Sequence, residues 1–429
     1  MKLTRVFAFM ALAGLAGSAY ATNGYFSHGY GMKAKGMAGA ATASSDDAFG
    51  GANNPASMAF AGNRLDLGVD LFNPNRSASR TGVTVGPANL DMSVDSDSEY
   101  FLIPEFGMTK QMSSTLALGV TVYGNGGMNT DYAGGQINCG QGPANMLCGQ
   151  GDLGVDLIQL IVAPTVAFKL APNHSIGISP LLGYQAFEAN GLQAFSMTPN
   201  VSSDPAHVTN NGHDDAFGYG VRIGYMGKIT PTVTIGAAYA SKMSFDEFDD
   251  YAGLFAEQGG FDIPENYNLG VAWQATPAFK LALDYQRISY SDVNSIANPS
   301  LVPFPLGADN GPGFGWQDID VWKLGAEYKY NQQLTLRAGW NHGDNPITAA
   351  DVTFNILAPG VIEDHVTLGF TYTLASGDEL TMSYMHGFSN DVSGASILPA
   401  FPPTNGAPAG METIEMDQNA LGIQYSWKM

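Results

Sequence analysis

Apolar and polar positions alternate with a period of two along most of this chain. Between residues 65 and 71, for example, Leu or Val occupies every odd position and Asp or Gly every even position. Such alternation predicts a β-strand with one apolar face and one polar face. Fourteen segments have this pattern, and they lie near residues 65–71, 100–108, 116–122, 155–170, 175–187, 217–225, 233–239, 267–273, 279–285, 322–328, 334–340, 366–372, 380–384 and 421–427.

The connections between these segments alternate as well. Those after the even-numbered segments are short, as in the sequences KITPT and SGD, whereas those after the odd-numbered segments are long. An even number of antiparallel strands, with short turns at one end and long loops at the other, is typical of outer-membrane barrels. The pattern predicts an all-β fold, a 14-stranded antiparallel transmembrane β-barrel with both chain ends on the periplasmic side.

The apolar faces are expected to contact lipid, because the opposite faces carry Asp, Arg, Lys, Gly and Thr. Several Tyr and Trp residues, such as Tyr239, Trp273 and Trp427, lie at or near strand ends, which is typical of the aromatic girdles at the two membrane surfaces. The alternative is a secreted soluble β-protein, in which the apolar faces would fill the interior and the aromatic residues would belong to an ordinary core.

The start of the chain does not alternate. Residues 22–62 are rich in Gly, Ala and Met, and glycines interrupt their helix-compatible run from Met32 to Ala43 at a cost of about 1 kcal/mol each. We expect this segment to form a compact hatch inside the lumen of a barrel made by residues 63–429. Residues 1–21 have a basic start, a short apolar core and an A-x-A site, and are the predicted signal peptide of an exported protein.

Composition supports a membrane-embedded wall. Charged residues make up 13% of the chain, whereas about 25% is usual in soluble domains, and the formal net charge is −21. This negative charge argues against binding to nucleic acid and against electrostatic docking on anionic lipid. After residue 21, no apolar run reaches the roughly 18 residues that would predict a membrane-spanning helix.

The two cysteines, Cys139 and Cys148, lie in one Gly-rich loop. In an exported chain, two close cysteines predict a disulfide, which would stabilise this loop locally by about 2–3 kcal/mol. A metal site would need more ligands than the loop offers, so no metal is expected.

Several short motifs occur in a fixed order. GMKAKGMAGA begins at Gly31, and the later motifs are Asp46-Asp47-Ala48, Asn54-Pro55-Ala56, Ile263-Pro264-Glu265, Leu336-Arg337-Ala338-Gly339, Asp344-Asn345-Pro346 and Ser383-Tyr384-Met385-His386-Gly387. In this order and in a fourteen-strand frame, the chain resembles the FadL/TodX family of outer-membrane transporters of long-chain fatty acids and other hydrophobic compounds. The resemblance implies a barrel plugged by an N-terminal hatch, and passive uptake with lateral release at a kink in the third strand.

In this chain the third strand runs into a glycine-rich sequence. Glycines inside or at the end of a strand favour bulges and lost pairing, so Tyr123, Gly124 and Gly126 are candidates for a lateral opening. The alternative is an ordinary strand end before the cysteine loop. In the hatch, Asn54, Pro55 and Ala56 are candidates for gating, or for a turn that leads into the first strand.

Three cations lie on the predicted lumen face, namely Arg222, Lys323 and Arg337. Each is a candidate to bind the carboxylate of a fatty acid, and arginine does so through two parallel hydrogen bonds. The alternative is that they pair with lumen acids such as Asp284 or Glu327 and brace the barrel or the hatch.

We therefore expect a monomeric outer-membrane channel for passive uptake of hydrophobic molecules, first of all long-chain fatty acids, with release into outer-membrane lipid. The alternatives are uptake of aromatic hydrocarbons and, in another class, a surface adhesin or structural barrel. Neither an enzyme nor a cofactor is expected, because HExxH and GxSxG motifs are absent and His213 and His342 lie in polar loops. The acidic run 246–250 could hold Ca²⁺, but a solvated loop is the more usual role.

Overall fold

The structure is a computed structural model, and it describes residues 23–85, 88–197, 200–406 and 408–429. The predicted signal peptide, residues 1–21, lies outside the described residues. Among the helices that the structure describes, none is long and apolar enough to cross a lipid bilayer.

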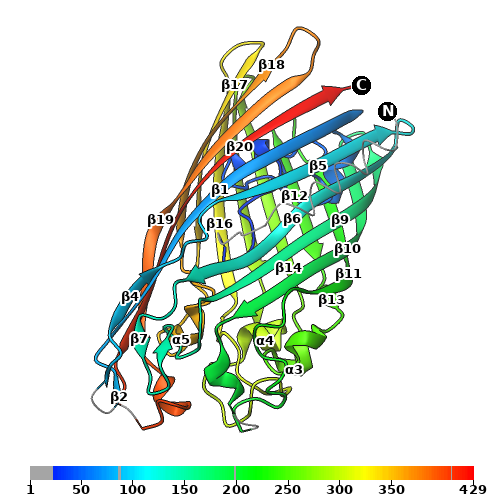
Figure 1. The fold of residues 1–429 in the computed structure, drawn as a ribbon. Helices are drawn as coiled ribbons and strands as arrows, with labels where there is room; N and C mark the ends of the chain where they lie inside the picture. The colour runs from blue at the N-terminus through cyan, green and yellow to red at the C-terminus, as the bar shows by residue number, and fades with distance from the viewer. Residues whose placement is uncertain (1–22, 86–87, 198–199, 407) are drawn as a thin grey trace.

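Fourteen strands of the described chain form one closed antiparallel barrel (Figure 1), as the alternation predicts. Their order around the wall is β10-β9-β6-β5-β1-β20-β19-β18-β17-β16-β15-β14-β12-β11, and β11 closes on β10. The strands are β1 (Arg64–Thr81), β5 (Phe101–Gln111), β6 (Leu116–Tyr132), β9 (Leu153–Ala171), β10 (His174–Asn190), β11 (Asp214–Lys228), β12 (Val233–Ala240), β14 (Asn266–Thr276), β15 (Phe279–Ile288), β16 (Ile319–Lys329), β17 (Leu334–Gly343), β18 (Asp364–Thr373), β19 (Glu379–Ala395) and β20 (Met411–Lys428).

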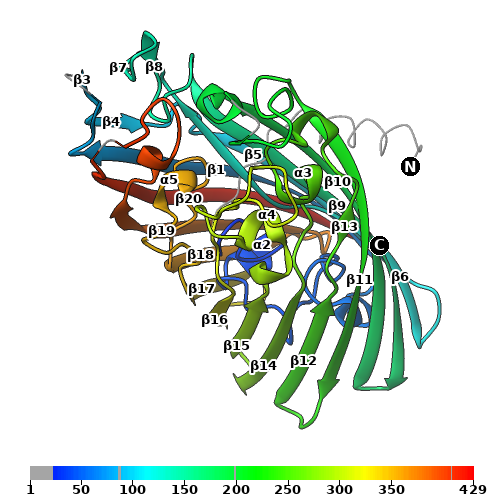
Figure 2. The same ribbon diagram turned by 90° about the horizontal axis from the view of Figure 1, so that it is seen from below.

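Short strands and helices lie outside this ring. The strands are β2 (Thr84–Val85), β3 (Ala88–Asn89), β4 (Met92–Asp95), β7 (Ile137–Asn138), β8 (Pro143–Ala144) and β13 (Ser244–Phe245). The helical turns of the loops are η2 (Gln193–Ser196), η3 (Asp249–Tyr251), α3 (Ala256–Gly259), η4 (Tyr290–Asp292), α4 (Asn294–Ala297), α5 (Val352–Asn355) and η5 (Leu398–Ala400). Seen from the loop end, α3, α4 and α5 lie with their loops across the mouth of the barrel (Figure 2).

The two ends of the barrel differ as the connection lengths predict. At one end, strands are joined by turns of two to five residues, at 112–115, 172–173, 229–232, 277–278, 330–333 and 374–378. Arg64 at the start of β1 pairs with Lys428 at the end of β20, so the barrel begins and ends on the turn side.

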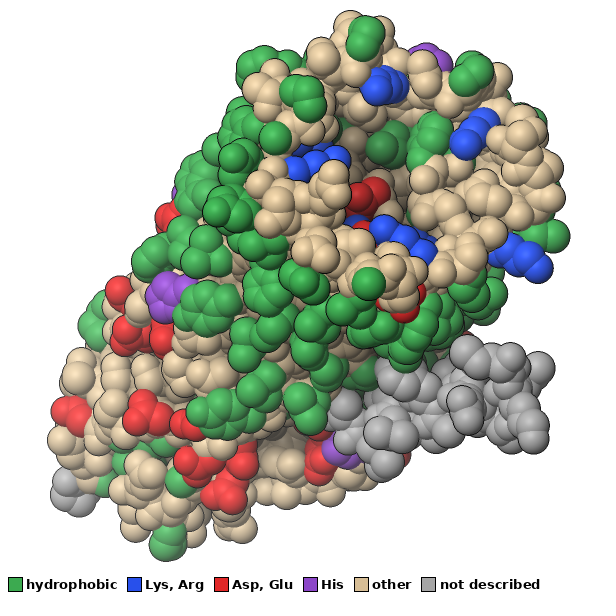
Figure 3. All heavy atoms as spheres, turned by 90° about the horizontal axis from the view of Figure 1, so that it is seen from above, with side chains coloured by type: hydrophobic (Ala, Val, Ile, Leu, Met, Phe, Trp, Pro, Cys, Tyr) green, Lys and Arg blue, Asp and Glu red, His purple; other side chains and the backbone are tan. Residues whose placement is uncertain are grey.

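The outer wall is an apolar belt. On β1, the outward Leu71 is 40% exposed, whereas the adjacent Asp70 faces the lumen and is 1% exposed. Apolar surface in water is unfavourable by roughly 25 cal/mol per Å², so this belt requires lipid. Seen from the turn end, green side chains form a belt on the outer wall, and blue and red side chains are visible inside the ring (Figure 3). Exposed aromatic residues lie towards both edges of the belt, namely Tyr239, Tyr267, Trp322 and Trp340 on the loop side and Trp273, Tyr328, Tyr372 and Trp427 on the turn side.

Some strands are much longer than the alternation of apolar residues predicts. β1 and β20 each have 18 residues and β19 has 17, whereas a tilted strand crosses a bilayer with about 9–11. Beyond the pair Asn73 and Asn419 the outward positions of β1 are polar, as at Asn75, whose side chain donates to Asp417 on β20. These strands extend as a tongue on the loop side (Figure 1).

Residues 23–63 lie inside the barrel, and we call them the hatch (dark blue in Figure 1). They contain only two short helices, α2 (Met32–Lys35) and η1 (Pro55–Ala59). The helix-compatible run from Met32 to Ala43 thus gives four helical residues. The chain turns away at Ala38 and Gly39, whose φ angles of 54° and 85° are left-handed and cannot continue an α-helix.

Lumen-facing acids hold the hatch in place. Lys35 Nζ lies 2.9 Å from Asp70 Oδ2 on β1 and 2.8 Å from Glu105 Oε1 on β5. Asp284 on β15 accepts hydrogen bonds from the backbone N–H groups of Ala41 (2.9 Å) and Thr42 (2.8 Å). The polar inner faces of the strands therefore bind the backbone and the cations of the hatch.

Candidate functional site

The barrel wall lacks pairing at one place, on the strand where Tyr123, Gly124 and Gly126 lie. β5 and β6 pair only from Phe106↔Val122 to Gln111↔Ala117. Further towards the loop side, β5 continues to pair with β1, and β6 continues to pair with β9. The pairing across this seam resumes only at the bridge between Ser96 and Tyr132. In the described chain, residues 123–130 of β6 thus have no ladder partner on the β5 side, and we call them the unpaired edge.

A β-bulge lies within the unpaired edge. The register of β6 against β9 shifts between Gly124 and Gly126, so Asn125 is the extra residue. Its side chain donates to Gln159 Oε1 on β9 at 3.1 Å, inside the lumen. A bulge bends its strand, which turns β6 away from the line of β5. The glycines predict a bulge here, and its role as a lateral opening stays a prediction.

The first residues of the hatch cover the unpaired edge from inside. Phe26 forms a β-bridge with Gly126, and Ser27 N–H donates to the backbone oxygen of Asn125 at 3.3 Å. The hydroxyl of Tyr30 donates to the same oxygen at 3.2 Å. The start of the hatch thus supplies hydrogen bonds that a neighbouring strand would supply elsewhere in the wall.

Aromatic side chains from the loops hold this part of the hatch. The Tyr25 ring lies 5.4 Å from the Tyr290 ring and 5.9 Å from the Trp316 ring, measured between centroids. The Tyr290 hydroxyl donates to the backbone oxygen of Asn23 at 2.6 Å and accepts from Tyr25 N–H at 3.2 Å. The loops between β15 and β16 are therefore connected directly to the residues that cover the unpaired edge.

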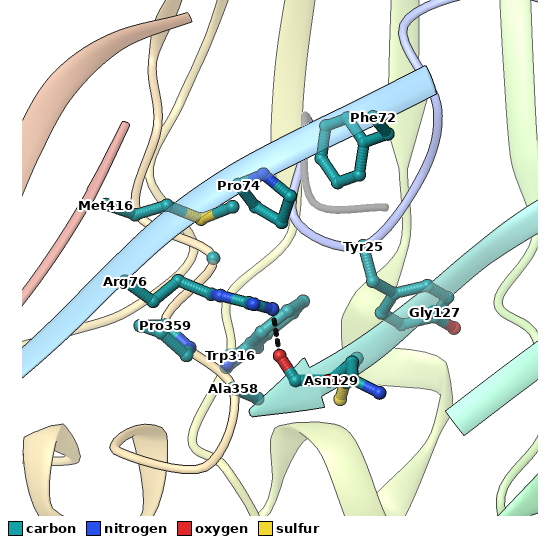
Figure 4. Close-up of a pocket in the computed structure, with 12 residues that line it drawn as sticks. Tyr25, Phe72, Pro74, Arg76, Gly127, Asn129, Trp316, Ala358, Pro359 and Met416 are labelled. Atoms are coloured by element: carbon teal, nitrogen blue, oxygen red, sulfur yellow. Dashed lines mark hydrogen bonds between the residues drawn. The ribbon is translucent and has the colours of Figure 1, made fainter. Parts of the chain in front are cut away.

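A small cavity lies beside the unpaired edge (Figure 4). It measures about 20 Å³, which is room for about one water molecule. Its lining comes from β1, β6, β20, the hatch and two loops, namely Tyr25, Phe72, Pro74, Arg76, Gly127, Met128, Asn129, Trp316, Ala358, Pro359, Gly360 and Met416. Arg76 is the one charged residue of this lining.

A second, apolar cavity lies among the loops. It measures about 40 Å³, and its lining includes Leu147, Val155, Phe187, Leu192, Phe195, Leu254, Phe255, Leu306, Phe314, Phe354 and Leu357. The loop residues Phe255 and Phe401 are almost fully buried, and the Phe401 ring packs edge-to-face against the Phe195 ring, with 5.1 Å between the centroids. Loop-to-loop packing therefore uses the apolar loop residues, and it leaves a pocket without a charged side chain.

The three candidate lumen cations have different surroundings. Arg337 donates to Glu327 at 2.8 Å and to Thr371 at 2.6 Å, so it braces the wall across β16, β17 and β18. Lys323 donates to the backbone oxygen of His28 in the hatch at 3.0 Å. Arg222 is 4% exposed, and its Nε and Nη1 have no hydrogen-bond partner among the described residues.

Arg222 and Lys323 share a polar cavity, and Arg337 does not line it. The cavity measures about 20 Å³ and lies between the hatch and strands β11, β14, β15 and β16. Of the three candidates, Arg222 and Lys323 are therefore placed where a ligand carboxylate could reach both. That role stays a prediction.

Asn54, Pro55 and Ala56 pack against the inner wall. Asn54 Nδ2 donates to the backbone oxygens of Thr42 (2.7 Å) and Tyr225 (3.0 Å), and Asn54 Oδ1 accepts from Ala56 N–H at 3.1 Å. Asn54 thereby caps the short helix η1, with proline at its first position. The triplet is a turn at the far end of the hatch from the unpaired edge, and a gating role stays a prediction.

Two hatch residues have ionisation equilibria that burial changes. Burial, followed by the neighbouring carboxylate of Asp66, raises the pKa of Asp47 to about 6. Burial, followed by the neighbouring ring of His365, lowers the pKa of His28 well below its usual range. The hatch thus contains a carboxyl group that titrates near neutral pH and a histidine that stays uncharged.

Most of the remaining sequence candidates lie in the loops. His342 was expected in a loop but lies in β17, where its Nδ1 is 3.1 Å from Asp364 Oδ1 on β18. Cys139 and Cys148 form a disulfide, next to an apolar cluster that includes Val83 and Leu90. Among the described residues, no group of three or more His, Cys, Asp or Glu side chains is arranged to hold a metal ion. His213 contacts Asp156 and Glu188 on the surface, which is a polar loop contact.

The sequence analysis did not predict the roles of Trp316 and Arg76. Their positions depend on contacts between segments far apart in the sequence, such as the hatch and the loop before β16. The one local signal near Arg76 is Pro74, two residues earlier on the same lumen-facing side of β1. Proline lacks the N–H that a paired strand would use, so it favours an unpaired stretch.

Comparison with known proteins agrees with this architecture. The family model described as outer membrane protein transport protein (OMPP1/FadL/TodX) matches residues 11–397. No curated protein sequence matches the chain significantly. Among solved structures, the Pseudomonas putida toluene transporter TodX is 19% identical with a TM-score of 0.69, covering 94% of this chain and 99% of that one.

Two further solved structures are similar. A FadL homologue from Pseudomonas aeruginosa is 15% identical with a TM-score of 0.69, and the Ralstonia pickettii toluene transporter TbuX is 17% identical with a TM-score of 0.64. In both cases the match covers 94% of this chain and 99% of the other. At these identities the structures show a shared fold, and the family match extends over most of the sequence. This chain therefore belongs to the OMPP1/FadL/TodX family of outer-membrane transport proteins, β-barrel channels for hydrophobic compounds.

Proposed function

We propose that this channel takes up long-chain fatty acids by passive diffusion and releases them sideways into the membrane through the unpaired edge. The observation that carries the proposal is the unpaired edge itself. It lies at the height of outward apolar residues such as Leu71 and Leu102, which are 40% and 55% exposed. A ligand that leaves the lumen there enters lipid directly.

The hatch supports a lateral path over an axial one. Residues 23–63 fill the lumen and are bound to its wall by ion pairs and backbone hydrogen bonds. A long-chain ligand gains about 0.8 kcal/mol for each CH₂ group that stays out of water. Release into the bilayer is therefore favoured over release into the aqueous periplasm, and the large hatch need not leave the barrel.

The path begins at the loops. The apolar cavity lined by Phe187, Phe255 and Phe354 is the capture site, because burial of an alkyl chain there is favourable. From there the ligand moves to the lumen, where Arg222 and Lys323 bind its carboxylate through charge-assisted hydrogen bonds. A shift of residues 25–30 then uncovers Gly126 and its neighbours.

The test removes the bulge. Deletion of Asn125 restores an unbroken register between β6 and β9, and we expect it to abolish uptake of labelled oleate by cells that lack their own transporter. Asn125→Ala is the matched control, because it removes the hydrogen bond to Gln159 and keeps the extra residue. Equal uptake by both variants at equal surface expression would overturn the lateral path.

Uptake of aromatic hydrocarbons is the second candidate. It is favoured by the loop cavity, whose lining contains no charged residue, and such a ligand needs no cation in the lumen. Similar folds are described for the toluene transporters TodX and TbuX. Toluene uptake without oleate uptake by the wild-type protein would select this candidate. If neither compound moves, a surface adhesin or structural barrel replaces the transport proposal.

A further inference from the structure

Arg76 is a buried cation beside the unpaired edge, and its nearest partners are neutral. It lies on β1 and is 5% exposed. Its Nη1 donates to the backbone oxygen of Asn129 on β6, and its Nη2 donates to the backbone oxygen of Ser98. Nε has no hydrogen-bond partner among the described residues. Figure 4 shows the guanidinium pointing into the cavity towards Asn129.

Most other arginines of the described chain are neutralised. Arg64, Arg80, Arg287 and Arg337 form ion pairs at 2.9, 2.6, 2.8 and 2.8 Å. Arg76 and Arg222 have no such ion pair among the described residues. Glu99 interacts electrostatically with Arg76 but forms no ion pair with it, so the removal of the guanidinium charge from water is offset only in part. An anion that enters this cavity would therefore be stabilised by Arg76.

Arg76 also lies at the seam in the barrel wall. β1 pairs with β5 up to Phe72↔Phe101, and it pairs with β4 from Ser77↔Asp95 onward. Between these ladders the chain that contains Ser98 leaves the sheet. The guanidinium joins that chain to β6, and so it ties the two sides of the seam together where backbone pairing is absent.

We propose that Arg76 is a binding site for the carboxylate of an anionic amphiphile, and that binding there releases the tie and opens the unpaired edge. This inference rests on the proposed function and specifies which ligands open the wall. A carboxylate competes well with the two backbone oxygens, because it brings an opposite charge and accepts two parallel hydrogen bonds in the geometry that a guanidinium fits. The alkyl chain then lies against Phe72, Met128 and Met416.

Binding and opening are coupled by the size of the cavity. At about 20 Å³ it admits about one water molecule, so a carboxylate with its chain fits only when Arg76 and its partners move apart. A ligand shifts a conformational equilibrium only by binding one state better than the other. The carboxylate does so, since it reaches the guanidinium only in the open state. A neutral hydrocarbon has no group that replaces the two carbonyls.

The first test measures binding without transport. Trp316 lines the cavity, whereas Trp273, Trp322, Trp340 and Trp427 lie on the outer wall. With these four replaced by Phe, the purified protein reports quenching of Trp316 by 2-bromotetradecanoate, whose bromine is next to the carboxylate. We expect the wild-type protein to be quenched. In Arg76→Gln, the ligand concentration that gives half of the maximal quenching is expected to be about tenfold higher. The methyl ester of the same acid is the neutral probe and is expected to quench weakly.

Arg76→Lys keeps the charge without the two-pronged geometry, so it is expected to bind with intermediate strength. It also serves as the variant of choice if Arg76→Gln does not assemble. Arg287→Gln is the control for loss of an arginine elsewhere, since Arg287 pairs with Asp318 and Asp320 near the loops. Equal quenching by the acid and its methyl ester would overturn the inference. Equal quenching of the wild-type protein and Arg76→Gln by the acid would overturn it too.

The second test measures uptake in cells. Arg76→Gln is expected to lower tetradecanoate uptake and to leave toluene uptake unchanged or increased, because the tie is then weaker for every ligand. An equal loss of both would mean that Arg76 only supports the fold. Failure of the wild-type protein to transport either compound would overturn the proposed function itself. The quenching experiment would still decide whether Arg76 binds the carboxylate, because it measures binding without transport.

Discussion

Gly126 of the bulge and Tyr25 of the hatch are in such close contact that a Cβ atom on Gly126 would lie 1.9 Å from the backbone oxygen of Tyr25. Only glycine permits this approach, and with it the bridge between Phe26 and Gly126. The start of the hatch and the unpaired edge are thus fitted to each other through backbone atoms, independently of side-chain chemistry.

Gly126→Ala is expected to detach the start of the hatch from β6. The new methyl group cannot be accommodated without a shift of the Tyr25 backbone, so the hydrogen bond from Ser27 N–H to Asn125 is lost. Amide hydrogen exchange of residues 25–30 would then accelerate. Gly68→Ala is the control, because its Cβ meets its nearest neighbour at an ordinary 3.5 Å. Unchanged exchange in Gly126→Ala would contradict the fit.

Lys35→Met is expected to loosen the whole hatch. The change leaves Asp70 and Glu105 buried beside each other without their cation, which costs about 3–5 kcal/mol when one partner of a buried ion pair is removed. Single-channel recordings should show a higher baseline conductance for small ions. Lys329→Met, at an exposed position at the end of β16, should behave as wild type. Adding Asp70→Asn and Glu105→Gln to Lys35→Met should restore part of the loss.

Asp47 is expected to make the hatch more stable at low pH. The pKa of about 6 in the folded chain exceeds the ordinary value of 3.8, so the folded chain holds this proton more tightly than the unfolded chain. Its contribution is fully present below about pH 4 and is lost as the pH rises through about 6, by on the order of 3 kcal/mol. The urea midpoint of the near-ultraviolet signal of the hatch tyrosines should fall between pH 5 and 7.5.

Asp47→Asn should remove this pH dependence. The amide oxygen of asparagine can still accept the hydrogen bond from Phe49 N–H, which the carboxylate accepts at 3.0 Å. The variant should therefore have the same urea midpoint at both pH values. A midpoint that still falls by the same amount would assign the titration to another group.

Loss of the disulfide is expected to act only on the loops. Replacement of Cys139 and Cys148 by Ala should destabilise the loop by about 2–3 kcal/mol, because the bond closes a short segment. Proteinase K added to intact cells should then cleave within residues 133–152, while the barrel keeps its resistance to heat in detergent. Cleavage at an unchanged rate would show that packing against Val83 and Leu90 suffices.

The strand positions were predictable because lipid imposes a rule on every second residue. Leu71, Leu421 and Ile423 must all be apolar on one side of the wall, and this regularity is visible without neighbours. The tongue of β1, β19 and β20 escapes the rule, because its outward residues face water. There the outward side chains are polar as well as the inward ones, as at Asn75 and Asp417, so no apolar alternation marks the strand.

The candidate site was only partly predictable. The glycines around Asn125 indicate a bulge, but the end of pairing at Phe106 depends on how far the next strand follows β6, which is a tertiary property. Arg76 and Arg80 occupy equivalent lumen-facing positions on β1. Arg80 forms an ion pair with Glu412, whereas Arg76 forms none with a described carboxylate, and no local pattern distinguishes the two.

The lengths of the ladders have a mechanical consequence. β1 and β20, which close the ring, share eighteen residue pairs, whereas β5 and β6 share six, the fewest between neighbours in the described wall. A load that stretches the ring would therefore separate β5 and β6 before any other pair of neighbouring strands in the described wall. If the wall opens sideways as proposed, the thickness of the host membrane is expected to influence the opening through its mismatch with the barrel, and the separation is expected between β5 and β6.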